Sequence, residues 1–157
     1  SKSQYQNVTE KNIIHKNDIL FYQTFTDTAS TLNAKIRTNT SLFTSKNLLC
    51  SKGPEFNLLS KKQREILFTT LFTISKDNNR MGYRFNEIIP NNFSSILTSA
   101  VLPGTVQLTP SGKIIVLMKD CQVTGGYPRV LQLTKEAIAI LAQKSTNQNV
   151  NFQLSKV

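Results

Sequence analysis

The 157-residue chain lacks most of the side chains on which metal and nucleophilic chemistry depend. It has a single histidine, His15, and two cysteines, Cys50 and Cys121, whose spacing matches no metal-binding motif. One histidine is too few for a histidine-based metal site and leaves little basis for a catalytic triad, and no suitable histidine could activate Cys121. The sequence predicts no metal site, and two thiols that stay reduced in a cytoplasmic protein.

Long apolar runs and acidic residues are also scarce. No run reaches the length of a membrane span, and no signal peptide opens the chain, so we expect a cytoplasmic protein without membrane contact. Nine Asp and Glu face nineteen Lys and Arg, which gives a formal net charge of +10. The basic residues are scattered and are not interleaved with aromatic ones, so we expect no nucleic-acid ligand. A basic surface that meets an acidic partner explains the charge as well.

Glycine and proline are absent from residues 1 to about 50, whereas all six glycines and all five prolines lie between Gly53 and Pro128. We therefore assign 1–50 to strands and loops and 48–157 to a more regular subdomain, most simply within one continuous domain, 1–157. The strands expected in the first part are 12–14, 18–22 and 34–38, with a turn at 16–18.

The second part alternates short apolar runs with turn residues, a pattern typical of a mostly β protein. Ser60 and Thr134 each precede a helical run and can cap its free N–H groups, so we expect two short helices, 60–68 and 134–143. Many short strands with two short helices predict a β barrel. The expected strands are 48–50, 71–74, 83–89, 95–99, 106–108, 114–118 and 150–154, with turns at 77–79 and 110–113.

The densest group of polar side chains directly follows the apolar run 114–118 and Lys119. Residues 120–128, Asp-Cys-Gln-Val-Thr-Gly-Gly-Tyr-Pro, combine a carboxylate, an amide, a hydroxyl, two glycines and a phenol. Adjacent glycines let the backbone adopt positive φ or approach a ligand closely, and a rigid strand end holds polar groups in place. The segment is a candidate site, and a tight turn between two strands is the alternative.

Four segments resemble one protein family in order and spacing: 80–84 (RMGYR), 103–107 (PGTVQ), 120–128 and 141–143 (LAQ). This is the carboxyltransferase-like family of the 5-oxoprolinase C subunit, also called allophanate hydrolase subunit 2, which also forms part of the carboxyltransferase domain of urea carboxylase. The resemblance covers nearly the whole chain and implies a cyclophilin-like β-barrel. It also implies that the chain corresponds to the C-terminal half of a longer protein, because residues 1–3 resemble a segment near the middle of the family's domain.

The resemblance implies a subunit of a bacterial ATP-dependent 5-oxoprolinase, a hydrolase that opens a lactam to glutamate. Its partners would be the companion 5-oxoprolinase subunits and a small amide or lactam substrate, and without its N-terminal half the chain would be inactive. ATP would serve the full complex, since the sequence has no Gly-x-x-x-x-Gly-Lys-Ser/Thr loop. Two alternatives stay open: a carboxyltransferase domain that uses biotin and acts on urea or a related amide, and a regulatory module without catalysis.

The candidate catalytic residues are Asp120, Gln122 and Thr124. Asp120 is the only carboxylate of the central motif and could act as a general base or merely fix a turn. Gln122 and Thr124 alternate across Val123, so a strand would send both to one face, where they could stabilise developing charge. The family usually has a threonine where this chain has Val123, so one hydroxyl is missing here.

The candidate substrate-binding residues come from three of the motifs. Arg80 could hold an anion through its planar fork, or pair with Asp77 or Glu87. Tyr83 could face the cleft or pack in the core with one hydrogen bond. If the motifs build one cleft, these side chains must converge. Because the chain resembles one half of a two-part domain, we also expect self-association or an exposed groove beside residues 122–127, where the other half would pack. The set comprises Arg80, Tyr83, Gln107, Gly125, Gly126 and Tyr127.

Overall fold

The computed structural model describes residues 16, 17, 19 and 40–155. The chain divides into two units, Ser1–Arg37 and Thr38–Val157, and the second unit contains every element described below. The strands expected in the first part lie outside the described residues. Of the turn expected there, Lys16 and Asn17 are described and form a turn, with Asn17 at a φ of 79°.

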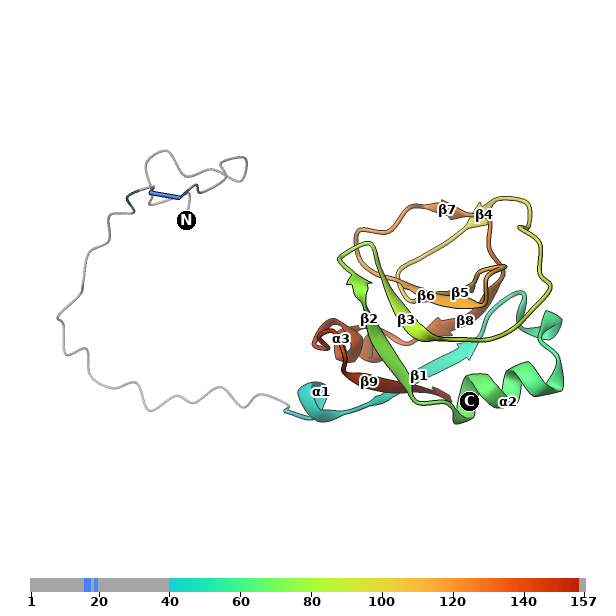
Figure 1. Ribbon diagram of the computed structural model, residues 1–157, viewed down its shortest axis with the longest axis horizontal. Helices are drawn as coiled ribbons and strands as arrows, with labels where there is room; N and C mark the ends of the chain where they lie inside the picture. Colours follow the sequence, from blue (N-terminus) through green and yellow to red (C-terminus); the bar gives the residue numbers. More distant parts are fainter. Residues whose placement is uncertain (1–15, 18, 20–39, 156–157) are drawn as a thin grey trace. The chain divides into compact units, whose positions relative to one another are not determined.

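Seven strands form a closed barrel in the order β1-β8-β5-β6-β3-β2-β9, and β4 pairs with β7 in a separate two-stranded sheet (Figure 1). The mostly β architecture expected from the sequence is confirmed. Strand β1 closes the barrel by pairing parallel with β9, whereas the other neighbouring strands of the barrel pair antiparallel. The elements are α1 (Ser41–Thr44), β1 (Asn47–Lys52), the 3₁₀ turn η1 (Phe56–Leu58), α2 (Lys61–Thr69), β2 (Phe72–Asn78), β3 (Gly82–Ile88), β4 (Ser99–Ala100), β5 (Thr105–Leu108), β6 (Lys113–Leu117), β7 (Thr124–Gly125), β8 (Arg129–Leu133), α3 (Lys135–Ala142) and β9 (Asn149–Leu154).

Large apolar side chains fill the inside of the barrel. Phe72, Phe85 and Phe152 come from β2, β3 and β9, are at most 1% exposed, and meet edge to face with centroids 5.4–5.9 Å apart. Offset aromatic pairs of this kind add stability beyond the area that they bury. Because the interior is occupied, any ligand site of the described unit must lie on the outside of the barrel or at its ends.

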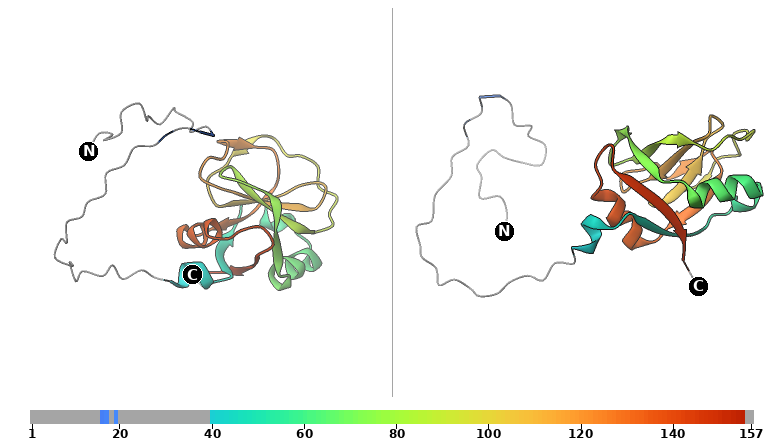
Figure 2. Two further views of the ribbon diagram at one scale, coloured as in Figure 1. Left: turned by 60° about the vertical axis from the view of Figure 1, so that its left-hand side comes forward. Right: turned by 60° about the horizontal axis from the view of Figure 1, so that its bottom comes forward.

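Both expected helices are present, and both begin at the expected cap. Ser60 accepts a hydrogen bond from the Gln63 N–H, and the Gln63 side chain accepts one from the Ser60 N–H, which makes a capping box before α2. Thr134 caps α3 by accepting from the Ala137 N–H. Helix α3 packs its buried residues against β1 and β8, and α2 lies beside β9 (Figure 2). None of the helices in the described part of the chain is long and apolar enough to cross a membrane.

The β4–β7 sheet lies outside the barrel near β5 and β6 (Figure 1). Ser99 pairs with Gly125 and Ala100 with Thr124, and the Val101 N–H donates to the Val123 carbonyl at 3.0 Å. The strand expected at 95–99 is therefore mostly wrong, because only its last residue pairs in a sheet. The Ile96 N–H, in the backbone before it, donates to the carbonyl of Gly126 in the same partner segment.

Other expected boundaries also need correction. The turn expected at 77–79 begins later, because β2 continues to Asn78 and the Asn79 side chain accepts hydrogen bonds from the Met81 and Gly82 N–H groups. Strand β8 was not expected from the sequence. It contains a bulge, since Val106 lies opposite Leu131 whereas Gln107 lies opposite Arg129. The helices α1 and η1 were also not expected, and each has at most four residues.

Candidate functional site

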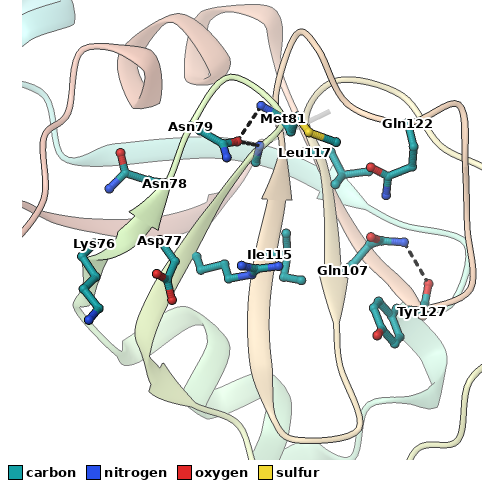
Figure 3. A pocket seen from close by; sticks show the side chains of 12 residues that line it. Lys76, Asp77, Asn78, Asn79, Met81, Gln107, Ile115, Leu117, Gln122 and Tyr127 are labelled. Atoms are coloured by element: carbon teal, nitrogen blue, oxygen red, sulfur yellow. Dashed lines mark hydrogen bonds between the residues drawn. The ribbon is translucent and has the colours of Figure 1, made fainter.

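A groove of about 450 Å³ lies on the outer face of the barrel across β2, β3, β6 and β5 (Figure 3). Its volume falls within the usual range for small-molecule sites, which is roughly 300–1,000 Å³. The 120–127 segment covers one end of the groove and the hairpin between β2 and β3 borders it. The residues that line it are Lys76, Asp77, Asn78, Asn79, Met81, Gly82, Arg84, Gln107, Ile115, Leu117, Gln122 and Tyr127.

Strand alternation explains why these side chains face outward. Ile114 and Val116 of β6 are fully buried in the core, so the side chain between them, Ile115, points to the outer face. Arg84 of β3 lies opposite Ile115, and Ile115 lies opposite Gln107 of β5. Residues directly opposite each other in antiparallel strands share a face. Arg84, Ile115 and Gln107 therefore form one row across three strands at the floor of the groove.

Gln107 is the most enclosed polar side chain of this groove, with 1% of its surface exposed. Its Nε2 donates a long hydrogen bond of 3.4 Å to the Tyr127 carbonyl. Its Oε1 has no hydrogen-bond partner among the described residues, and this oxygen is not fully enclosed by other atoms. This acceptor therefore opens into the groove. An acceptor held by a buried side chain is suited to receive an N–H group from a ligand.

Gly125 is explained by its contact with Gln107. A Cβ at Gly125 would lie 2.6 Å from Nε2 of Gln107, so a larger residue would have to displace this buried amide or move the β4–β7 sheet away. Neither Gly125 nor Gly126 has a positive φ, in contrast to Gly104 and Gly112. The adjacent glycines therefore allow a close approach of the backbone, and positive φ plays no part. At Gly126 a Cβ would make only an ordinary contact with the Ile96 carbonyl, at 3.4 Å.

Gln122 and Tyr127 complete the part of the groove that the central motif provides. Figure 3 shows the Gln122 side chain extending from its loop toward the Gln107 side of the groove. Neither the Gln122 amide nor the Tyr127 hydroxyl has a hydrogen-bond partner among the described residues. Apolar side chains are also exposed in this region: 77% of Val123 is accessible, as are 91% of Leu97 and 67% of Leu102 in the segment that contains β4. Both an exposed groove and exposed apolar side chains are thus present beside residues 122–127.

Arg80 and Asp120 meet each other beside the groove and do not line it. Arg80 Nε lies 2.5 Å from Oδ2 of Asp120 and its Nη2 lies 3.2 Å from Oδ1, so the alternative partners Asp77 and Glu87 are not used. The Asp120 N–H also donates to the Arg80 carbonyl at 2.9 Å. The Arg80 guanidinium lowers the pKa of the Asp120 carboxyl. This pair ties the loop before Gln122 to the β2–β3 hairpin.

Three other predicted residues lie away from the groove floor. Tyr83 has the same facing as Phe85, and its hydroxyl donates to the Lys144 carbonyl at 3.4 Å. Burial raises the pKa of Tyr83, in agreement with the core alternative. Thr124 is exposed in β7 and does not line the groove, whereas Gln122, in the loop before β7, does. The 120–128 motif therefore contributes Gln122 and Tyr127 to the groove lining, and Gly126 does not line the groove.

Sequence reasoning missed three charged residues of the groove: Lys76, Asp77 and Arg84. Arg84 belongs to a recognised motif, and the inward facing of Tyr83 and Phe85 would have indicated that it points outward. A second hollow continues the groove along the same face. It shares Asp77, Arg84, Ile115 and Tyr127 with the first, and adds Thr109, Pro110, Ser111 and Lys113.

An ion pair between Glu55 and Arg129 lies next to Gln107 and holds the neighbouring strands. Arg129 Nη2 lies 2.7 Å from Oε1 of Glu55, and its Nε and backbone N–H both donate to Oε2 at 2.9 Å. Its Nη1 donates to the Ala100 carbonyl of β4 at 2.9 Å. Arg129 also lies opposite Gln107 in the barrel. The pair therefore holds β4, and through it β7, beside Gln107.

The described residues contain neither a cluster of metal ligands nor a helix N-terminus at the groove. No cluster of three His, Cys, Asp or Glu side chains occurs among them. Burial raises the pKa of the Cys50 thiol to about 11 and also raises that of Cys121, so neither favours a thiolate. A phosphate cradle needs several backbone N–H groups directed at one point. No helix N-terminus lines this groove, so a helix-based phosphate cradle is not formed there.

The closed, mostly β barrel with few short helices defines the fold class of this chain. The family model for the carboxyltransferase domain, subdomain A and B, matches residues 3–154, and the chain belongs to this family. The chain is 34% identical over 102 residues to the 5-oxoprolinase C subunit of Escherichia coli (strain K12), and the match covers 64% of this chain and 33% of that protein. It spans about a third of the length of the curated relatives it matches.

Solved structures share the barrel fold. A crystal structure of TTHA0988 aligns with a TM-score of 0.65 and 22% identity, over 76% of this chain and 24% of that one. The urea carboxylase of Kluyveromyces lactis aligns with a TM-score of 0.63 and 14% identity, over 76% of this chain and 11% of that one. At these identities the likeness establishes the fold alone.

Proposed function

We propose that this chain is part of a subunit of a bacterial 5-oxoprolinase and that its groove binds the lactam substrate. One observation carries the proposal: Gln107, otherwise buried, presents an unpaired amide oxygen to a groove of small-molecule size. The relatives, each named as the C subunit of 5-oxoprolinase, support the choice of substrate. Companion subunits supply the remainder of the enzyme in this proposal, because both relatives are named as one subunit of it.

In this reaction water adds across the lactam C–N bond, so that hydroxide joins the carbonyl carbon and a proton joins the nitrogen to give glutamate. Gln107 Oε1 accepts a hydrogen bond from the lactam N–H, and the Gln122 amide donates to the lactam oxygen as negative charge develops there. Tyr127 also lines the groove, and its hydroxyl would donate a second hydrogen bond to that oxygen. Together these groups fix the orientation of the amide plane.

Asp120 remains the proposed base, which orients or deprotonates the attacking water. Its carboxylate pairs with Arg80 beside the groove, so this role requires the exposed pair to open. Thr124 belongs to the same proposal and would act only if β7 moved toward the groove. We assign the nucleotide that drives the reaction to a part of the enzyme outside the described residues, because the sequence has no Gly-x-x-x-x-Gly-Lys-Ser/Thr loop and no helix N-terminus lines the groove. The chain alone is therefore proposed to bind substrate without turning it over.

The test is turnover of 5-oxoproline by a purified complex in which the subunit that includes this chain is assembled with its companion subunits. We expect glutamate to form only when ATP is present, and Gln107→Met to lower kcat/KM about tenfold or more, because the variant keeps the volume and loses the acceptor. Gln153→Met is the matched control, since Gln153 lines a different hollow with residues of β1 and α3.

Two results would contradict the proposal. A wild-type complex that leaves 5-oxoproline unchanged, or that carboxylates urea with biotin instead, would refute the assignment of substrate. A Gln107→Met complex with normal kcat/KM would refute the role of the groove, provided that its melting temperature matches that of the wild type.

A further inference from the structure

Arg84 is the unpaired arginine of the groove. Among the arginines of residues 40–155, Arg80 pairs with Asp120, Arg129 pairs with Glu55, and Arg64 donates to the Asn57 carbonyl. Arg84 makes no side-chain hydrogen bond or ion pair with any described residue, although it lines both hollows of the outer face. A guanidinium presents a rigid fork of donors that matches the two oxygens of a carboxylate.

The register of the barrel fixes the separation between Arg84 and Gln107. Both lie opposite Ile115, on the two strands that flank β6. Directly opposite Cα atoms are about 4.5–5.5 Å apart, so the Cα atoms of Arg84 and Gln107 are separated by about 10 Å. Both side chains are long and share one face. A small ligand that lies over Ile115 can therefore contact Gln107 at one side and Arg84 at the other.

The charge around Arg84 favours an anion. Lys76 lines the same groove and Lys113 lines its continuation, whereas Asp77 is the only carboxylate in the two linings. The two linings together therefore contain three cationic side chains and one acidic side chain. Neither lysine is paired with a described acidic residue, so their charges remain available to a ligand. The opposite end, at Met81, Leu117 and Gln122, has no charged lining residue.

We propose that Arg84 binds a carboxylate group of the substrate and that the groove selects amides carrying such a group next to the amide nitrogen. This inference rests on the proposed function and adds the specificity determinant to it. The lactam N–H faces Gln107 across Ile115 while the carboxylate faces Arg84, with Lys76 and Lys113 adding to the local positive potential. Urea and unsubstituted lactams have no carboxylate and lose this contact.

The test measures binding of two probes to the full chain by ligand-observed NMR: 5-oxoproline, and 2-pyrrolidinone, which is the same lactam without its carboxylate. We expect the wild-type chain to bind 5-oxoproline about tenfold or more tightly, and Arg84→Gln to abolish that preference while leaving 2-pyrrolidinone binding unchanged. Arg84→Lys should restore part of the preference, because it keeps the charge and loses the fork. Lys62→Gln on α2 is the matched control for loss of one positive charge away from the groove.

The outcomes separate this inference from the proposed function. If folded Arg84→Gln binds 5-oxoproline as tightly as the wild type does, or if the wild type does not distinguish the two probes, the inference is wrong and the proposed function stands. If Arg84→Gln weakens both probes equally, Arg84 acts through the structure of the groove and the inference is also wrong. If the wild-type chain binds neither probe, the proposed function fails together with the inference.

Discussion

The ion pair between Glu55 and Arg129 yields a prediction whose magnitude follows from the geometry. Glu55→Gln removes the charge and replaces one carboxylate oxygen by a donor that faces another donor. Breaking a fully buried ion pair costs about 3–5 kcal/mol, whereas exposed pairs contribute about 0.2–1 kcal/mol. Each side chain here keeps 19% of its surface exposed, and the carboxylate accepts three hydrogen bonds. We therefore expect the free energy of unfolding to fall by about 2–3 kcal/mol.

Urea denaturation at neutral pH measures this loss, and Glu65→Gln provides the control. Glu65 is exposed on α2 and its carboxylate pairs with no described residue, so that variant should change stability by less than about 0.5 kcal/mol. If Glu55→Gln is no more destabilising than Glu65→Gln, the assignment of Glu55–Arg129 as a supporting ion pair is refuted.

The pH dependence of the same variant provides a second check. Hydrogen bonds from Arg129 lower the pKa of the Glu55 carboxyl. A depressed carboxyl pKa contributes stability above the ordinary value of about 4.3, and this stability is lost as the pH falls through the folded-state pKa. The difference between wild type and Glu55→Gln should therefore be full at neutral pH and shrink in acid below about pH 4. A difference that stays constant down to pH 2 would contradict the ion-pair account.

Two further predictions concern the central motif. Asp120→Asn should lower turnover of the assembled complex by about a hundredfold or more. Its melting temperature should stay nearly unchanged, because the Arg80–Asp120 pair is exposed. Normal turnover would exclude Asp120 as the base, and Asp77→Asn then tests the carboxylate that lines the groove. Gly125→Ala should weaken 5-oxoproline binding by displacing the Gln107 amide, since the new Cβ would lie 2.6 Å from Nε2. Ligand-observed NMR measures the binding, and a melting curve checks that the variant is folded. Unchanged binding would show that the β4–β7 sheet can shift away from Gln107.

Local signals predicted the two longer helices, α2 and α3, but neither α1 nor the 3₁₀ turn η1. Ser60 with Gln63, and Thr134 before an amphipathic run, are capping patterns that act within one helical turn, so their sequence spacing suffices to locate α2 and α3. Strand β8 escaped prediction because its bulge breaks the alternation on which strand recognition depends. Val130 and Leu131 are consecutive and both buried, and no two-residue period marks them as a strand.

The candidate site was predictable in part. Of the residues that the motifs singled out, Gln107, Gln122 and Tyr127 line one groove, whereas the position of Arg80 and Asp120 beside it depends on how a hairpin and a loop meet. The row Arg84–Ile115–Gln107 depends on the register of three strands that are distant in sequence. Register is set by the tertiary packing of each strand's buried face, so the spacing of residues along the chain does not reveal which of them lie opposite one another.

Because the interior of the barrel is packed, the residues that stabilise the fold and those that line the groove lie on opposite faces of the strands. Phe72, Phe85 and Phe152 occupy the inside, so the same strands can present ligand-binding side chains only on their outer face. On β3 the two roles alternate residue by residue: Phe85 packs inward, and the neighbouring Arg84 faces the groove. A substitution at Phe85 should therefore destabilise the barrel, whereas one at Arg84 should change ligand affinity and leave the core intact. Gln107 is the exception, because burial by the β4–β7 sheet makes it both a packing residue and the acceptor of the groove.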